Sequence, residues 1–186
     1  MTKEKIAKVN RDEAMLLLID VQERLLPVMS EAAALEAKLG TLIQGCTLFD
    51  VPTLVTQQYT KGLGPTVPSL QNVLGDAEVV EKHTFSACGE PAFLEALARM
   101  GRKTILLTGI ESHICVLQTA LDLLERGYEI FLVYDGIDSR SPQDKKFASK
   151  RMVREGAIFT TCESVLFELC GDAKGPGFKE LSALVK

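Results

Sequence analysis

Short runs rich in apolar residues alternate along the chain with longer segments in which apolar residues recur at helical spacing. The short runs are 14–19, 53–56, 78–81, 103–108, 129–134 and 157–160. The longer segments are 31–48, 90–100, 112–126, 141–155, 163–169 and 178–185. Runs of the first kind predict strands, and a recurrence every three or four residues predicts helices. The pattern therefore predicts a chain in which strands and helices largely alternate.

The predicted strands are apolar at nearly every position rather than at every second one. Strands of this kind are buried on both faces, which is typical of a parallel sheet covered by helices on both sides. Gly62, Gly64, Pro65 and Pro68 predict a loop after the second strand. We therefore expect one α/β domain over residues 1–186, with a three-layer, doubly wound sheet of about six mostly parallel strands.

Polar residues stand where these strands end. Asp20 ends the first strand, Gln58 the second, Lys82 the third and Asp135 the fifth. Cys115 follows the fourth strand after a Thr-Gly break and lies at the start of the next helix. Ligands of open parallel sheets bind outside the carboxyl ends of the strands. We therefore expect a carboxylate, an ammonium group and a thiol at one edge of the sheet.

These three groups suit nucleophilic catalysis on a carbonyl carbon. The free N–H groups and the dipole at a helix start favour the Cys115 thiolate, and Lys82 favours it further. Asp20 is placed to accept the thiol proton and then to activate water against a thioester. Backbone N–H groups in the turn before Cys115 are candidates for an oxyanion hole.

Three segments also carry a resemblance to a known family. Residues 16–22 (LLLIDVQ), 81–86 (EKHTFS) and 109–116 (GIESHICV) resemble the signature segments of the isochorismatase-like cysteine hydrolases. Residues 51–68 are more similar to the isochorismatase-domain-containing subgroup than to nicotinamidases. The resemblance implies an Asp20–Lys82–Cys115 triad, a three-layer α/β fold and a cis peptide bond between Ile110 and Glu111, which would aim backbone N–H groups at the oxyanion.

The sequence differs from nicotinamidases and from true isochorismatases at positions that bear on the expected substrate. Nicotinamidases bind a metal after the second strand, where this chain has Gln58 and Thr60, neither of them a strong ligand. We therefore expect no metal and no other cofactor, and nicotinamide is disfavoured as a substrate. True isochorismatases lack the nucleophilic cysteine, whereas Cys115 is present here. The resemblance thus favours hydrolysis of a C–N bond in a small amide or related acyl compound.

Further residues are candidates for the site, although aromatic and apolar side chains more often belong to a core. We expect His113 to make a structural hydrogen bond, because residues two apart on a helix do not face each other. The candidates for a substrate pocket are Gln22, Gln58, Tyr59, Phe85 and Ile114.

Composition excludes several other classes of protein. The net charge is −4 with no dense basic face, which gives no support for binding nucleic acid or for the ribonuclease label of some relatives. The five cysteines include no CxxC pair, so a disulfide framework or zinc site is not expected. The polar start, 1–8, and the short apolar runs predict a soluble, cytoplasmic protein without a membrane segment. By resemblance we expect a homo-oligomer.

Two alternatives to an enzyme remain open at this point. Cys115 can serve a thiol-based redox sensor, in which case Cys88 is the candidate resolving cysteine. The chain can also be a binding protein that kept the fold without turnover, because fold alone does not imply function.

Overall fold

The computed structural model describes residues 7–186, so residues 1–6 of the polar N-terminal segment lie outside the described residues. Its centre is a six-stranded sheet in the order β3-β2-β1-β4-β5-β6, and every strand pair is parallel. The strands are β1 (Ala14–Ile19), β2 (Thr53–Gln58), β3 (Glu78–Lys82), β4 (Thr104–Gly109), β5 (Glu129–Ile137) and β6 (Ile158–Thr160). The predicted parallel α/β architecture is confirmed.

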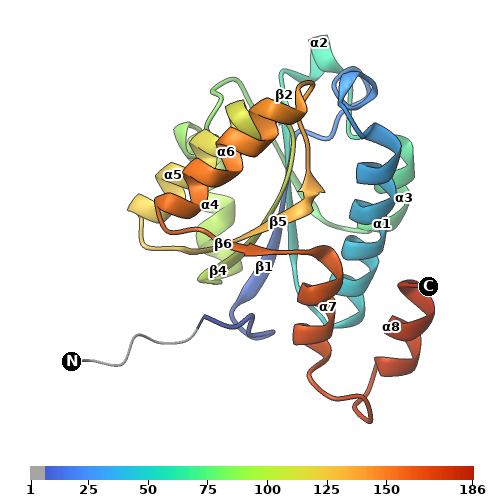
Figure 1. Ribbon diagram of the computed structural model, residues 1–186. Coiled ribbons are helices and arrows are strands. Elements are labelled where there is room, and N and C mark those ends of the chain that lie inside the picture. Colours follow the sequence, from blue (N-terminus) through green and yellow to red (C-terminus); the bar gives the residue numbers. More distant parts are fainter. Residues whose placement is uncertain (1–6) are drawn as a thin grey trace.

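Helices cover both faces of the sheet, as Figure 1 shows. One face carries α1 (Ala32–Leu48), α3 (Pro68–Leu74), α7 (Cys162–Cys170) and α8 (Phe178–Leu184). The other carries α4 (Pro91–Met100), α5 (Leu117–Glu125) and α6 (Pro142–Arg154). Among residues 7–186, no helix combines the length and the apolar composition needed to span a bilayer.

The strand β1 shows why the apolar runs lack alternation. Leu16 and Leu18 pack in the core beneath α1 and α7, whereas Met15, Leu17 and Ile19 pack in the second core beneath α4, α5 and α6. Successive side chains of a strand point to opposite faces, so a strand with a core on each side is apolar throughout. The same division holds in β4, β5 and much of β2.

The segment after β2 is more helical than its glycines and prolines predict. It contains the short helix α2 (Thr60–Leu63) and the helix α3, in which Pro68 occupies the first turn. Proline is tolerated there because the first N–H groups of a helix lack partners within it. Leu70 anchors α3 in the core beside α1. The expectation that Pro68 belongs to a loop was therefore wrong, because Pro68 is the first residue of α3.

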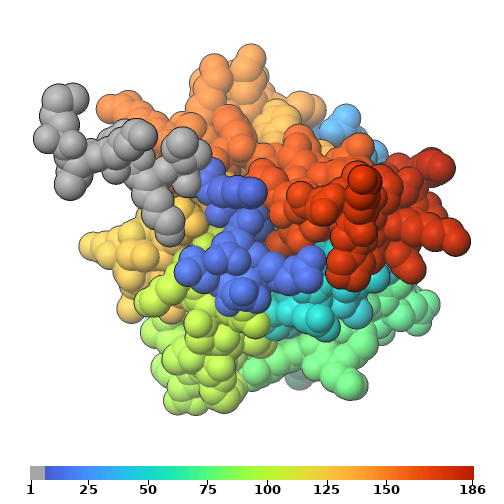
Figure 2. Space-filling view, turned by 90° about the horizontal axis from the view of Figure 1, so that it is seen from below, coloured from blue at the N-terminus to red at the C-terminus, as the bar shows by residue number. Residues whose placement is uncertain are grey.

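The segment before β1 lies against the helix α7. In Figure 2 the blue N-terminal region lies against the red C-terminal region. The N–H of Val9 donates to the Glu168 carboxylate at 2.8 Å, and Arg11 donates to the carbonyl oxygen of Leu169 at 2.9 Å. These contacts attach the segment before β1 to α7.

The strand order reverses between β1 and β4, which makes their carboxyl ends the expected place for a ligand. The chain passes this point through Gly109, whose φ is +111°. A Cβ atom on Gly109 would lie 2.1 Å from the carbonyl oxygen of Ile19, in the neighbouring strand. Only glycine fits this conformation and this close approach.

We expect Gly109→Ala to lower the free energy of unfolding by about 3 kcal/mol or more, because it adds a backbone clash to the unfavourable φ. Gly101 is a matched control, since its φ is +64° and open space surrounds the corresponding Cβ position. Gly101→Ala is expected to cost only about 1–2 kcal/mol. Urea unfolding measures both, and equal losses would contradict this account of Gly109.

Candidate active site

Asp20 directly follows β1 and lies completely buried. Its φ is +52°, a left-handed conformation that turns the chain sharply at the end of the strand. Its carboxylate oxygen Oδ1 accepts a hydrogen bond from the Thr56 hydroxyl at 2.7 Å, and its N–H donates to the carbonyl oxygen of Thr56 at 3.1 Å. The strand β2 thus fixes both the backbone and the side chain of Asp20.

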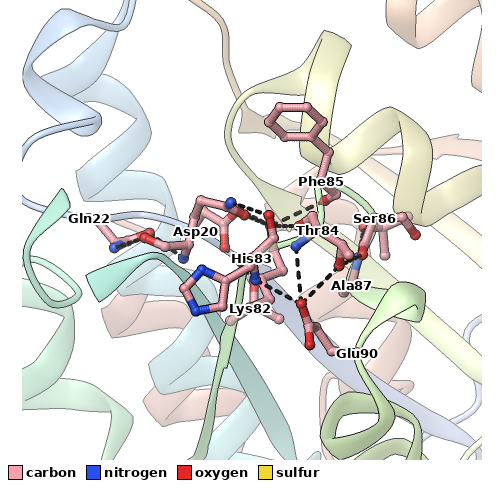
Figure 3. A network of polar contacts seen from close by, with 12 residues as sticks. Asp20, Gln22, Lys82, His83, Thr84, Phe85, Ser86, Ala87 and Glu90 are labelled. Atoms are coloured by element: carbon pink, nitrogen blue, oxygen red, sulfur yellow. Dashed lines mark hydrogen bonds and ion pairs between the residues drawn. The ribbon is translucent and has the colours of Figure 1, made fainter. Parts of the chain in front are cut away.

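Lys82 ends the edge strand β3 and is also completely buried, which is rare for lysine unless its charge is paired. Its Nζ lies 2.7 Å from Asp20 Oδ2. It donates to Gln58 Oε1 at 2.6 Å and to the carbonyl oxygens of Thr84 and Phe85 at 3.2 Å each. Figure 3 shows Lys82 beside Asp20 and the loop that follows β3. The ammonium group is therefore surrounded by oxygen atoms.

The Asp20 oxygen that faces Lys82 is bound by charge rather than by a directional hydrogen bond. Among residues 7–186, Asp20 Oδ2 accepts no hydrogen bond of acceptable geometry, although it forms the short ion pair with Lys82. A buried carboxylate oxygen with unused acceptor capacity is suited to receive a proton.

Cys115 lies in η3 (Ser112–Val116), a single π-helical turn that leads into α5. The thiol is nearly buried. Burial raises the pKa of Cys115 to about 12; the negative charge of Asp20 raises it as well, and the positive charge of Lys82 opposes both. The expectation that the helix start favours the thiolate was therefore wrong, because desolvation outweighs it. The structure nevertheless brings Cys115, Asp20 and Lys82 together.

The backbone just before Cys115 has an unusual form. The peptide bond between Ile110 and Glu111 is cis. Within the described part of the chain, the N–H of Glu111 has no hydrogen-bond acceptor. The Glu111 carboxylate accepts from the backbone N–H and from Nε of Arg140, both at 3.1 Å. The side chain of Glu111 is thus held by Arg140, while its own N–H is left without an acceptor among the described residues.

The loop after β3 is organised by Glu90, which the sequence analysis did not single out. Its carboxylate accepts from the N–H groups of His83 at 2.7 Å and Thr84 at 3.1 Å. These two hydrogen bonds lower the pKa of Glu90. Figure 3 shows this carboxylate below the loop that carries Thr84 and Phe85. A Glu-Pro pair at the start of a predicted helix was the only signal for it.

The residues predicted to line a pocket fall into two groups. Gln22 is completely buried; its side chain donates to the carbonyl oxygens of Gln58 at 2.9 Å and Gly64 at 2.6 Å and is a structural tie. Gln58 binds Lys82. By contrast, the rings of Tyr59 and Phe85 are largely exposed, and Ile114 is half-buried. Gln58 is half-buried as well, so of these five residues only Gln22 has no surface available for a ligand.

Several other polar residues have structural partners. The ring of His113 lies 3.0 Å from the Ser139 hydroxyl, as expected of a structural histidine. Asp135 accepts from the N–H of Cys162 at 2.8 Å, which connects β5 to α7, and it does not end its strand. Asp138, which the sequence analysis missed, accepts from Ser30 at 2.8 Å. These contacts join the segments around the carboxyl ends of the strands to one another.

The two positions that the sequence analysis compared with metal ligands of nicotinamidases, at and just after the end of β2, make other contacts. Gln58 uses its amide oxygen for Lys82, and the hydroxyl of Thr60 donates to Gln57 at 3.2 Å. Within residues 7–186, no group of three or more His, Cys, Asp or Glu side chains is arranged to hold a metal ion.

Comparison with known proteins identifies the family. Residues 14–164 match the family model described as the isochorismatase domain. The chain is 39% identical over 184 residues to isochorismatase domain-containing protein 2 of Danio rerio, with 97% of this chain and 90% of that protein covered. Isochorismatase domain-containing protein 1 of Salmo salar is 41% identical over 168 residues, covering 90% of this chain and 59% of that longer protein.

Solved structures agree with these relatives. The MAR1 ribonuclease from Caenorhabditis elegans superimposes with a TM-score of 0.90 at 38% identity, covering 96% of this chain and 92% of that one. The YcaC gene product from Escherichia coli, described as an octameric hydrolase of unknown specificity, gives 0.92 at 26% identity, covering 98% and 91%. The resemblance to the isochorismatase-domain-containing subgroup is confirmed, and the chain belongs to the isochorismatase family and has its hydrolase fold.

Proposed function

We propose that this protein is a cysteine hydrolase of small amides or related acyl compounds, with Cys115 as nucleophile and Asp20 as general base. The observation that carries the proposal is the buried Asp20–Lys82 ion pair at 2.7 Å, placed where both charges act on the Cys115 thiol. Lysine is almost never completely buried unless its charge is paired, and burying the pair costs free energy that a purely structural role does not require. A pair of this kind is suited to move a proton.

In the first half of the reaction, the Cys115 sulfur attacks the carbonyl carbon of the substrate while its proton passes to Asp20. The developing oxyanion lies near the turn before Cys115, where the free N–H of Glu111 is the candidate donor. When the tetrahedral intermediate collapses, the C–N bond breaks and Asp20 gives its proton to the leaving amine. A thioester remains on Cys115.

In the second half, Asp20 takes a proton from water as the water oxygen attacks the thioester. Collapse of this intermediate breaks the C–S bond and releases the carboxylic acid product. Asp20 returns its proton to the sulfur, which restores the thiol. At the start of each half-reaction, Lys82 forms the ion pair with the Asp20 carboxylate. All protons are thereby accounted for without a metal ion.

A panel of small primary amides and carbamoyl compounds tests this proposal. We expect the wild type to release ammonia from at least one of them, and Cys115→Ala and Asp20→Asn each to lower kcat/KM by about 10³ or more. Circular dichroism confirms folding of the variants. Single-stranded RNA, included because the C. elegans neighbour is a ribonuclease by name, should stay intact. Equal hydrolysis by wild type and Cys115→Ala would refute the proposal.

A second prediction concerns the reactivity of the thiol. Lys82 is the charge that lowers the pKa of Cys115, so Lys82→Met should raise it and leave less thiolate at any given pH. We expect iodoacetamide alkylation of Cys115 near about pH 8 to become about tenfold slower, with the pH profile displaced upward. Peptide mass spectrometry measures the rate.

Cys88 provides an internal control in the same samples. It is buried, and its pKa is raised to about 11 by burial and by Asp122, with no contribution from Lys82. Its alkylation rate should not change in Lys82→Met. An unchanged Cys115 profile in that variant would show that Lys82 does not act on the thiol.

We also propose that the protein forms a homo-oligomer, as the octameric E. coli neighbour does. Exposed aromatic side chains gather at the open β6 edge of the sheet, where Tyr134 and Phe159 pack edge to face and line a groove of about 700 Å³. A contiguous apolar surface of this kind is typical of a contact with a second copy.

Light scattering after size exclusion tests this assembly. We expect the wild type to exceed the monomer mass and Phe159→Glu to shift it toward the monomer, because the variant places charge in the contact. Val79→Glu is the matched control, since Val79 is 50% exposed and Phe159 47% exposed, but Val79 lies on the opposite edge strand β3. A monomeric wild type would refute the proposal.

A further inference from the structure

The amide of Gln58 is the closest neutral partner of the Lys82 ammonium group. A lysine ammonium has three N–H donors. Around Nζ lie one charged oxygen, Asp20 Oδ2 at 2.7 Å, and three neutral ones, of which Gln58 Oε1 is nearest at 2.6 Å. The other two, the carbonyl oxygens of Thr84 and Phe85, lie at 3.2 Å. Gln58 and Asp20 thus make the two short contacts of the same cation.

Three hydrogen bonds hold Gln58 itself and orient its side-chain oxygen. Its Nε2 donates to the carbonyl oxygen of His83 at 2.9 Å, which directs Oε1 toward Lys82. Its backbone N–H donates to Gln22 Oε1 at 2.7 Å, and Gln22 Nε2 donates back to the Gln58 carbonyl oxygen. Because Gln22 is completely buried, Gln58 is a rigid rather than an adaptable acceptor.

We propose that Gln58 is a positioning residue that holds the Lys82 ammonium against Asp20 and so controls how readily Cys115 loses its proton. This inference rests on the proposed function. The neutrality of the amide is essential to it. A carboxylate at this position would draw the ammonium away from Asp20 and add a second negative charge near the thiol, and both changes oppose proton loss from Cys115.

The other charged groups around the thiol have their own partners. Asp20 and Lys82 are the two charges that act on the pKa of Cys115. On the turn that carries Cys115, Glu111 pairs with Arg140 and His113 contacts Ser139. On the loop after β3, His83 contributes its backbone to Glu90, and Asp122 of α5 accepts from Ser86. A change of charge at position 58 therefore acts mainly through Lys82.

The experiment compares Gln58→Glu, Gln58→Met and Gln57→Glu. Gln57 is the matched control because it is the neighbouring glutamine of β2, and its side chain contacts Thr66 and Thr60. Iodoacetamide alkylation of Cys115 is followed against pH, with Lys82→Met as reference. We expect Gln58→Glu to be about tenfold slower near about pH 8 with its profile displaced upward, Gln58→Met about threefold slower, and Gln57→Glu unchanged.

The outcomes separate this inference from the function on which it rests. Equal displacement by Gln58→Glu and Gln57→Glu would overturn the inference, because the effect would then be one of general charge. An effect of Lys82→Met with none of Gln58→Glu would overturn it too, while leaving the proposed function intact. No effect of Lys82→Met would instead count against the function. Should Gln58→Glu fail to fold, Gln58→Met decides, and an unchanged rate contradicts the role of Gln58.

Discussion

The ion pair between Lys82 and Asp20 is the constraint on which the arrangement at the carboxyl ends of the strands depends. Removing two charges completely from water costs several kcal/mol for each ion, and their attraction offsets this cost only with good geometry and further hydrogen bonds. Thr56, Gln58 and the loop carbonyl oxygens supply those bonds. The ends of β1, β2 and β3 must therefore lie in their observed register, and the apolar strands that set this register serve the site as much as the core.

The same burial raises the pKa of the Cys115 thiol and so limits how the proposed nucleophile can act. A thiol with a pKa of about 12 is protonated at neutral pH, so Cys115 is a thiol rather than a thiolate before the reaction begins. A neighbouring base can remove the proton during attack, and a thiolate of high pKa is intrinsically the stronger nucleophile. The unused acceptor capacity of Asp20 Oδ2 matches this mode of action. In the proposed mechanism, the reactivity of Cys115 thus depends on the neighbouring carboxylate of Asp20 rather than on a helix dipole.

Much of this arrangement follows from local sequence, and the remainder does not. Apolar runs predicted the strands, and the rule about strand ends placed Asp20 and Lys82 together, because both signals lie within a few consecutive residues. Glu90 accepts a hydrogen bond from His83, and Gln22 donates one to the carbonyl oxygen of Gln58. These bonds join segments that are separate in the sequence, so no local pattern predicts them. The pKa of Cys115 was predicted in the wrong direction for the same reason, since burial is a property of the whole fold.

In Phe85 and Tyr59, the backbone contacts Lys82 whereas the side chain faces solvent. Phe85 directs its carbonyl oxygen to Lys82 at 3.2 Å, yet its ring is 56% exposed. Tyr59 donates its N–H to the carbonyl oxygen of Lys82 at 3.0 Å, and its ring too is largely exposed. A backbone contact survives replacement of the side chain. The rings of Tyr59 and Phe85 can therefore be replaced while the oxygen atoms around Lys82 stay in place. Under the proposed function, ligand selectivity can thus change without altering the groups that transfer the proton.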